Sequence, residues 1–441
     1  MLLRVVRLIL GLVVTALLFQ SLDARAERLG AYDYPFVDPL VATVVGTPQA
    51  NAMPLPELRR FRNTHIFELT GLVERPVPPV FFFERQGMKF GLVEQPGPAP
   101  LVFIIAGTGG GFNADKNQEL AKILYAAGFH VIGLPNPTFP NFAVNASTTG
   151  VPGRLREDAV DIYRAMQAAY ATVEDRIEVT AFHLTGYSLG GTYSAFVAEL
   201  DSREQVFDFE RVLLLNPAVS LFTSIGLVDD MLPTNTALER TTAREFTNQL
   251  LREFGRLYSS GEPIDFSGDF VYRLYANFEL SAIEIERLIG IAFRLSSANL
   301  TFTADVLAQT GVIVPPGAQI GWTTSMDEFY VRSIEFSFND YFDKIYMPFY
   351  EATVPGLTPK QMIADADLHA IEPYLLEADN VGLLTNADDL ILTAENMAFL
   401  ERVFPGDRAA IWPTGGHCGN YAQRDVAAYI QAFFRSADLS Q

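Results

Sequence analysis

The chain has 441 residues, of which 49% are apolar, and a formal net charge of -20. This apolar content is too high for a disordered protein and is sufficient for a large core. The excess of acidic residues argues against the broad basic face that phosphate contacts require, so we expect no nucleic-acid partner. A single cysteine, Cys418, excludes an internal disulfide and a zinc site built on two cysteines.

The first 26 residues have the three-part pattern of a secretory signal. Arg4 and Arg7 give a positive start, residues 8–19 carry no charge, and Ala24-Arg25-Ala26 supplies small residues for cleavage. The apolar stretch is shorter than the roughly 20 residues of a spanning helix. We expect residues 1–26 to be removed, leaving an exported protein, periplasmic or extracellular, with no stable membrane span. An uncleaved anchor is the alternative.

Strand and helix patterns alternate along much of the remaining chain. After an N-terminal extension (27–77), the sequence predicts early strands at 80–83 and 89–93. It then predicts strands at 101–105, 130–134, 182–185 and 212–215, separated by helices at 114–127, 155–171 and 189–200. Short apolar strands between helices are typical of a mostly parallel sheet with helices on both faces.

The alternation breaks between residues 222 and 379. This stretch is rich in aromatic residues and predicts helices, for example at 242–258 and 283–295. Alternation resumes in 380–441, with strands at 381–385 and 408–412 and helices at 394–403 and 421–434. We therefore expect a core in two parts (78–221 and 380–441), interrupted by a helical cap (222–379) at the edge where open α/β sheets bind ligands. A separate helical domain of unrelated role is the alternative.

A candidate nucleophile lies in the segment Gly186-Tyr187-Ser188-Leu189-Gly190-Gly191. The segment follows a predicted strand and opens a predicted helix, and a serine on such a tight turn stands clear of the sheet. Because a serine hydroxyl is weakly nucleophilic without a base, a histidine must lie nearby. His417 follows the last predicted strand, and Asp389 or Asp388, after the preceding strand, would orient it; we prefer Asp389, which precedes an apolar run.

Developing negative charge on the substrate oxygen requires fixed donors. The backbone N–H of Leu189 is one candidate. The loop Gly107-Thr108-Gly109 supplies the other, with Thr108 preferred and Gly109 the alternative. The glycine run is not a phosphate loop, because no Gly-Lys-Ser/Thr follows it.

These residues make the chain similar to the α/β-hydrolase superfamily over about residues 78–220 and 379–436. The order Ser188, Asp389, His417 is the order of that superfamily. The resemblance implies a doubly wound, mostly parallel sheet and hydrolysis through an acyl-enzyme.

We therefore expect an exported hydrolase that cleaves carboxylic esters, with a small-molecule or lipid-like substrate and without cofactor or metal. A serine peptidase of the same fold, resembling an aminopeptidase, and a non-catalytic binding protein are the alternatives. The sequence does not indicate an oligomeric state.

Overall fold

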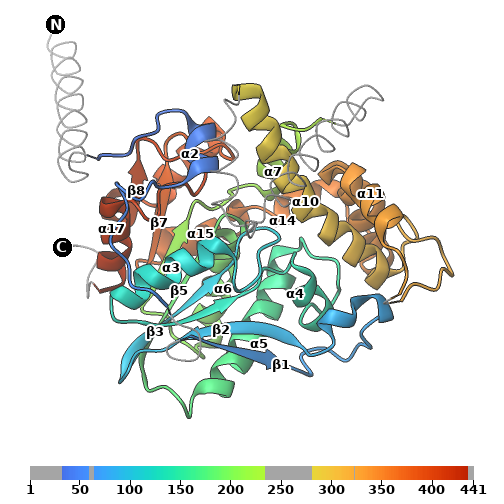
Figure 1. The fold of residues 1–441 in the computed structure, drawn as a ribbon, viewed down its shortest axis with the longest axis horizontal. Coiled ribbons are helices and arrows are strands. Elements are labelled where there is room, and N and C mark those ends of the chain that lie inside the picture. The colour runs from blue at the N-terminus through green and yellow to red at the C-terminus, as the bar shows by residue number, and fades with distance from the viewer. Residues whose placement is uncertain (1–31, 59–63, 234–280, 322, 436–441) are drawn as a thin grey trace, which may run out of the picture.

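The computed structural model describes residues 32–58, 64–233, 281–321 and 323–435 (Figure 1). The predicted signal at 1–26 and the predicted helix at 242–258 lie outside these residues.

One eight-stranded sheet forms the centre of the protein, in the order β1-β2-β4-β3-β5-β6-β7-β8. The first two strand pairs, β1 with β2 and β2 with β4, are antiparallel, and all the others are parallel. The strands are β1 (Thr64–Leu69), β2 (Met88–Val93), β3 (Ala99–Ile105), β4 (His130–Leu134), β5 (Val179–Tyr187), β6 (Arg211–Leu215), β7 (Val381–Asn386) and β8 (Ala409–Trp412). The expected fold class, a doubly wound and mostly parallel α/β sheet, is confirmed.

Helices cover both faces of the sheet because the buried strands are apolar on both sides. In β3, Leu101, Phe103 and Ile105 face one core and Val102 and Ile104 the other. The first core includes α5 (Leu155–Val173), α6 (Leu189–Glu204), α15 (Glu372–Glu377) and α16 (Ala394–Val403). The second includes α3 (Asp115–Ala126) and α17 (Arg424–Arg435). The short helices α4 (Pro140–Asn145) and η4 (Gly406–Arg408) connect these elements.

The described part of the segment between β6 and β7 consists of helices joined by loops, and helices are what its pattern predicted. It comprises α7 (Leu221–Asp229), α10 (Ala282–Ala308), α11 (Asp327–Glu335), α12 (Phe338–Tyr341), η2 (Phe342–Tyr346), α13 (Met347–Thr353), α14 (Pro359–Asp365), η3 (Leu368–Ile371) and α15. We call α7 to α14 the cap. Figure 1 shows α7, α10 and α11 on one side of the sheet.

The N-terminal region differs from the sequence prediction in two places. The predicted strand at 80–83 is wrong: these residues belong to the helical segment η1 (Pro79–Glu84), in which Phe81 is buried against Phe302 of α10. Proline favours a helix start, so Pro79 outweighs the β-propensity of the phenylalanines. The extension is also more ordered than predicted, since it contains α2 (Pro39–Val45) and the edge strand β1.

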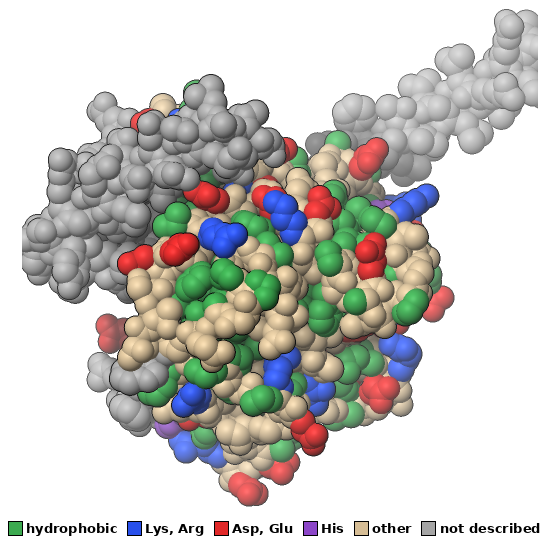
Figure 2. Space-filling view, turned by 90° about the vertical axis from the view of Figure 1, so that its right-hand side faces the viewer, with side chains coloured by type: hydrophobic (Ala, Val, Ile, Leu, Met, Phe, Trp, Pro, Cys, Tyr) green, Lys and Arg blue, Asp and Glu red, His purple; other side chains and the backbone are tan. Residues whose placement is uncertain are grey.

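The surface carries mixed charge. On the face shown in Figure 2, Lys and Arg side chains are scattered among Asp and Glu and form no continuous basic patch. Within the described residues, no helix has the length and apolar character needed to cross a bilayer.

Candidate active site

Ser188 occupies a sharp turn between β5 and α6. Its φ of 56° and ψ of -129° lie in a region that non-glycine residues rarely adopt. The turn is possible because its neighbours lack side chains: a Cβ on Gly186 would lie 2.2 Å from the Gly190 carbonyl oxygen, and one on Gly190 would lie 2.2 Å from the Ile105 carbonyl oxygen. The backbone N–H of Ser188 donates to Leu215 at 2.9 Å, which fixes the turn to β6.

The structure brings Ser188, His417 and Asp389 together in one hydrogen-bonded chain. His417 Nε2 lies 2.9 Å from Ser188 Oγ, and His417 Nδ1 lies 2.9 Å from Asp389 Oδ1. The side chain of Asp389 is fully buried, and that of His417 is 17% exposed. This geometry allows the imidazole to accept the serine proton while the carboxylate orients the ring.

The two neighbouring carboxylates have separate partners. Asp388 accepts hydrogen bonds from the backbone N–H groups of Gly415 and Gly416, and so holds the loop that carries His417. Asp389 reaches the imidazole itself. Of the two candidates left open by the sequence, Asp389 therefore lies where a triad acid is needed, and Asp388 fixes the backbone beside it.

A second set of hydrogen bonds fixes Asp389. Asn216 Nδ2 donates to Asp389 Oδ2 at 2.7 Å, and the Tyr421 hydroxyl donates to Asn216 Oδ1 at 2.9 Å. The backbone N–H of Ile391 donates to Asp389 Oδ1 at 3.1 Å. Burial disfavours the charged imidazole of His417, but the attraction of Asp389 outweighs it and raises the pKa of His417 well above 6.5.

The loop after β3 supplies a candidate oxyanion donor opposite Ser188. The backbone N–H of Gly109 donates to Thr138 Oγ1 at 2.7 Å and is therefore occupied. Among the described residues, the N–H groups of Thr108 and Leu189 have no such partner. Both residues line the cavity that contains Ser188 and His417, so the preferred pair of donors is free to bind an oxygen there.

The N-terminal extension reaches this site, a feature that the sequence prediction missed. His417 N–H donates to Thr43 Oγ1 at 2.8 Å, and the Thr43 hydroxyl donates to the Pro39 carbonyl at 2.7 Å. A Cβ on Gly416 would lie 2.3 Å from the Pro39 carbonyl oxygen, so α2 packs directly against the histidine loop. The hydrogen bond between His417 and Thr43 joins residues 374 positions apart, so no local pattern in the sequence indicates it.

The other four histidines lie away from Ser188, as expected. His65 contacts Glu94 at 3.1 Å at the sheet edge. His130 accepts from the Gln95 N–H at 3.1 Å, and His183 is buried between the rings of Phe129 and Phe434. His369 is an exposed partner of Asp367. No group of His, Cys, Asp and Glu in the described part of the chain has a metal-binding arrangement.

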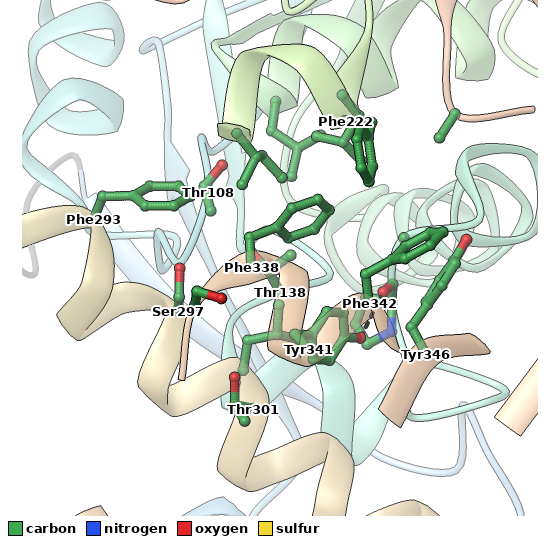
Figure 3. A pocket seen from close by; sticks show the side chains of 18 of the residues that line it. Thr108, Thr138, Phe222, Phe293, Ser297, Thr301, Phe338, Tyr341, Phe342 and Tyr346 are labelled. Carbon is green, nitrogen blue, oxygen red and sulfur yellow. Dashed lines mark hydrogen bonds between the residues drawn. The ribbon is translucent and has the colours of Figure 1, made fainter. Parts of the chain in front are cut away.

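Two cavities meet at the loop Gly107-Thr108-Gly109 after β3, which we call the oxyanion loop. The first, which we call the reaction cavity, contains Ser188 and His417 and has a volume of about 380 Å³. The second, which we call the cap cavity, is narrower, with a volume of about 50 Å³, and lies beneath the cap (Figure 3). Thr108, Leu189, Leu221, Ile225 and Phe293 line both.

The cap cavity is mainly apolar. No acidic or basic side chain occurs among its described lining residues, and its walls include Phe222, Phe338, Tyr341, Phe342 and Tyr346. The arrangement therefore suits an apolar group attached to a carbonyl bound between Thr108 and Leu189.

The sequence matches no family model and no curated protein. The solved structures that show low similarity to this chain include esterases and a peptidase. A variant of the esterase rPPE has 13% identity and a TM-score of 0.40, covering 90% of this chain and 86% of that one. Proline iminopeptidase from Mycobacterium smegmatis has 12% identity and a TM-score of 0.38, covering 80% and 96%. Est1E from Butyrivibrio proteoclasticus has 12% identity and a TM-score of 0.35, covering 79% and 93%.

The fold is assigned from this structure's own features. The strand order, the serine on the turn after β5 and the donor loop after β3 are all present. The chain has the α/β-hydrolase fold.

Proposed function

We propose that this chain is an exported serine hydrolase that cleaves carboxylic esters with apolar acyl groups. The observation that carries the proposal is the continuous chain from Ser188 Oγ through His417 to Asp389, beside two backbone N–H groups, those of Leu189 and Thr108, that have no partner among the described residues. Each of these groups has a role in acyl transfer.

In the first half-reaction, Ser188 Oγ attacks the ester carbonyl carbon and His417 Nε2 takes the hydroxyl proton. The carbonyl oxygen becomes an oxyanion held by the N–H groups of Leu189 and Thr108. The intermediate then collapses: the bond to the alcohol oxygen breaks, and His417 gives that oxygen the proton. In the second half-reaction, water attacks the acyl-serine by the same route and releases the acid and free Ser188.

The cavity lining favours an ester over a peptide with a free amino terminus. A buried ammonium group needs a carboxylate partner. Among the described lining residues of the two cavities, no Asp or Glu is present, and Lys116 and His417 are the ionisable side chains that could carry positive charge. An aminopeptidase-like activity therefore has less support than ester cleavage.

A panel of p-nitrophenyl esters and aminoacyl anilides tests the proposal. We expect the wild-type protein to hydrolyse the esters and Ser188→Ala to lose this activity while remaining folded. Turnover of anilides alone would favour the peptidase, and ester turnover that survives Ser188→Ala would exclude the proposed nucleophile. Sequencing the amino terminus of the protein from a secreting host tests export, with cleavage expected after Ala26.

A further inference from the structure

The cap cavity contains hydroxyl groups as well as apolar surface. Four of its eight described hydroxyl groups are engaged within the protein, among them Thr138, which donates to Asn136 Oδ1 at 2.7 Å, Tyr193, which donates to Asp158 at 2.7 Å, and Tyr341, which donates to the Pro152 carbonyl at 2.8 Å. These hydroxyls already have a hydrogen-bond partner within the protein and do not require one from a ligand.

The other four hydroxyls, those of Thr108, Ser297, Thr301 and Tyr346, make no hydrogen bond with a described residue, and of these Ser297 and Thr301 lie together on α10. Both line the cap cavity, and neither side chain makes a hydrogen bond with any described residue. A helical serine often donates to the carbonyl four residues earlier, as Ser296 does to Ala292 at 3.2 Å. Ser297 and Thr301 do not, although Thr301 is only 2% exposed.

Their spacing places both hydroxyls along one wall of the cavity. Residues four apart lie on the same face of a helix, separated by about 6 Å along its axis. Figure 3 shows Ser297 and Thr301 on the same helix, with Thr108 of the oxyanion loop on that side and Tyr346 across the cavity. A chain that starts at the oxyanion loop and fills the cavity would therefore pass both hydroxyls.

A purely hydrocarbon chain fits this wall poorly. It would displace the water that solvates these hydroxyls and offer no hydrogen bond in return, which lowers affinity. A charged substituent also fits poorly, since the described lining of this cavity has no ion to pair with it. A neutral oxygen on the chain can accept a hydrogen bond from these hydroxyls and has no charge that would need an ion to pair with it.

We propose that the cap cavity binds an acyl chain that is apolar along most of its length and carries a neutral oxygen function, a keto or hydroxyl group, partway along. Ser297 and Thr301 bind that oxygen and determine specificity for it. The proposal rests on the proposed function, because it identifies the acyl group that Ser188 would receive.

Matched esters test the proposal: p-nitrophenyl octanoate and the p-nitrophenyl esters of oxo-octanoic acids in which the keto group moves along the chain. In the wild-type protein we expect the best keto ester to exceed octanoate in kcat/KM by about tenfold, the effect of one or two hydrogen bonds. The double variant Ser297→Ala/Thr301→Val removes both hydroxyls and keeps the wall close to its original shape. It should bring the kcat/KM values of the two esters to parity.

The matched control is Thr353→Val, which removes a hydroxyl at an exposed position of α13, where it donates to the Phe349 carbonyl at 3.1 Å. This control should keep the wild-type preference. The two single variants serve as a second test if the double variant folds poorly, and each should lose part of the preference. An octanoate rate equal to or above that of every keto ester, or a preference retained in the double variant, would overturn the proposal. Wild-type turnover of octanoate and its loss in Ser188→Ala test the proposed function separately.

Discussion

The sheet edge and the cap build their halves of the site by different physical means. At the sheet edge, backbone geometry places the reactive groups. Ser188 has a positive φ, and the positions of Gly186 and Gly190 have no space for a side chain. In the cap, packing of aromatic rings shapes the cavity, with Phe222 at 5.7 Å from Phe338 and 5.3 Å from Phe342 between ring centroids. We therefore expect changes at the sheet edge to alter the chemical step and changes in the cap to alter stability and substrate range.

The largest expected effect lies at the sheet edge. Asp389→Asn leaves His417 without a carboxylate to fix its tautomer, which typically lowers kcat by about 10⁴-fold in a triad. Because activity requires neutral His417 and the pKa of His417 is raised, the wild-type rate should fall as pH drops through a midpoint above 6.5. The variant should shift this midpoint to lower pH. Profiles of kcat/KM against pH measure both effects.

Asp388→Asn is the matched control for that experiment. Its amide oxygen still accepts a hydrogen bond from the histidine loop, so we expect a far smaller loss of kcat and no shift of the midpoint. An Asp388→Asn loss as large as that of Asp389→Asn would contradict the separate roles of the two carboxylates.

The next effect concerns a buried ion pair in the cap. The side chain of Arg294 in α10 is 1% exposed, and its Nη2 lies 2.5 Å from Oδ1 of Asp229 in α7. The second carboxylate oxygen of Asp229, Oδ2, accepts a hydrogen bond from the Phe338 N–H. Arg294→Met leaves the carboxylate buried without its partner, which should lower the free energy of unfolding by about 3–5 kcal/mol. Adding Asp229→Asn removes the unpaired charge and keeps an acceptor, so the double variant should recover part of the loss. Urea denaturation measures both, and an unchanged midpoint for Arg294→Met would exclude this role of the pair.

Where the cap buries a charged pair, the sheet buries a neutral histidine. Burial, together with nearby Arg211, lowers the pKa of His183 to about 4, and its Nδ1 has no partner in the described residues. In the unfolded chain the pKa is about 6.5, so the unfolded state binds the proton more tightly. The stability contributed by neutral His183 is therefore complete above pH 6.5 and declines as pH falls towards 4, by about 3 kcal/mol.

His183→Phe tests this contribution among the neighbouring aromatic rings. The difference in unfolding free energy between wild type and variant should change with pH between 6.5 and 4, in the direction that makes the wild type relatively weaker in acid. A difference that stays constant over this window would show that His183 is not buried in its neutral form.

The smallest expected effect separates positioning from chemistry. Thr43→Val removes the acceptor for the His417 N–H, and a displaced base typically lowers kcat by about 10- to 100-fold. Thr43→Ser keeps the hydroxyl and should retain activity. A positioning role predicts a loss in kcat with little change in KM, because Thr43 acts through His417. Equal rates for Thr43→Val and wild type would show that α2 does not position the base.

The difference between the sheet edge and the cap also explains which features the sequence could predict. Buried strands and the serine turn have strong local patterns, and the predicted strand at 130–134 coincides with β4. The position of Asp389 relative to Asp388 depends on which way each side chain points, which the spacing of two adjacent residues does not determine. The contact of Thr43 with His417 is long-range, so propensity and periodicity give no sign of it.

The cap was predicted less fully for a related reason. Aromatic content indicated helices with a packed interior, but the cavity depends on how α7, α10 and α12 meet. The error at 80–83 has a local cause: a phenylalanine run resembles a strand, while the flanking prolines and the absence of a partner strand favour a helical turn.

The central claim, that His417 activates Ser188 as a nucleophile, is tested most directly by covalent labelling. A fluorophosphonate probe reacts with an activated serine, and peptide mass analysis identifies the labelled residue. We expect one adduct on Ser188 in the folded wild-type protein, loss of that adduct in Ser188→Ala, and strongly slowed labelling in His417→Ala. Folded wild-type protein that stays unlabelled, or that carries the adduct on another residue, would contradict it.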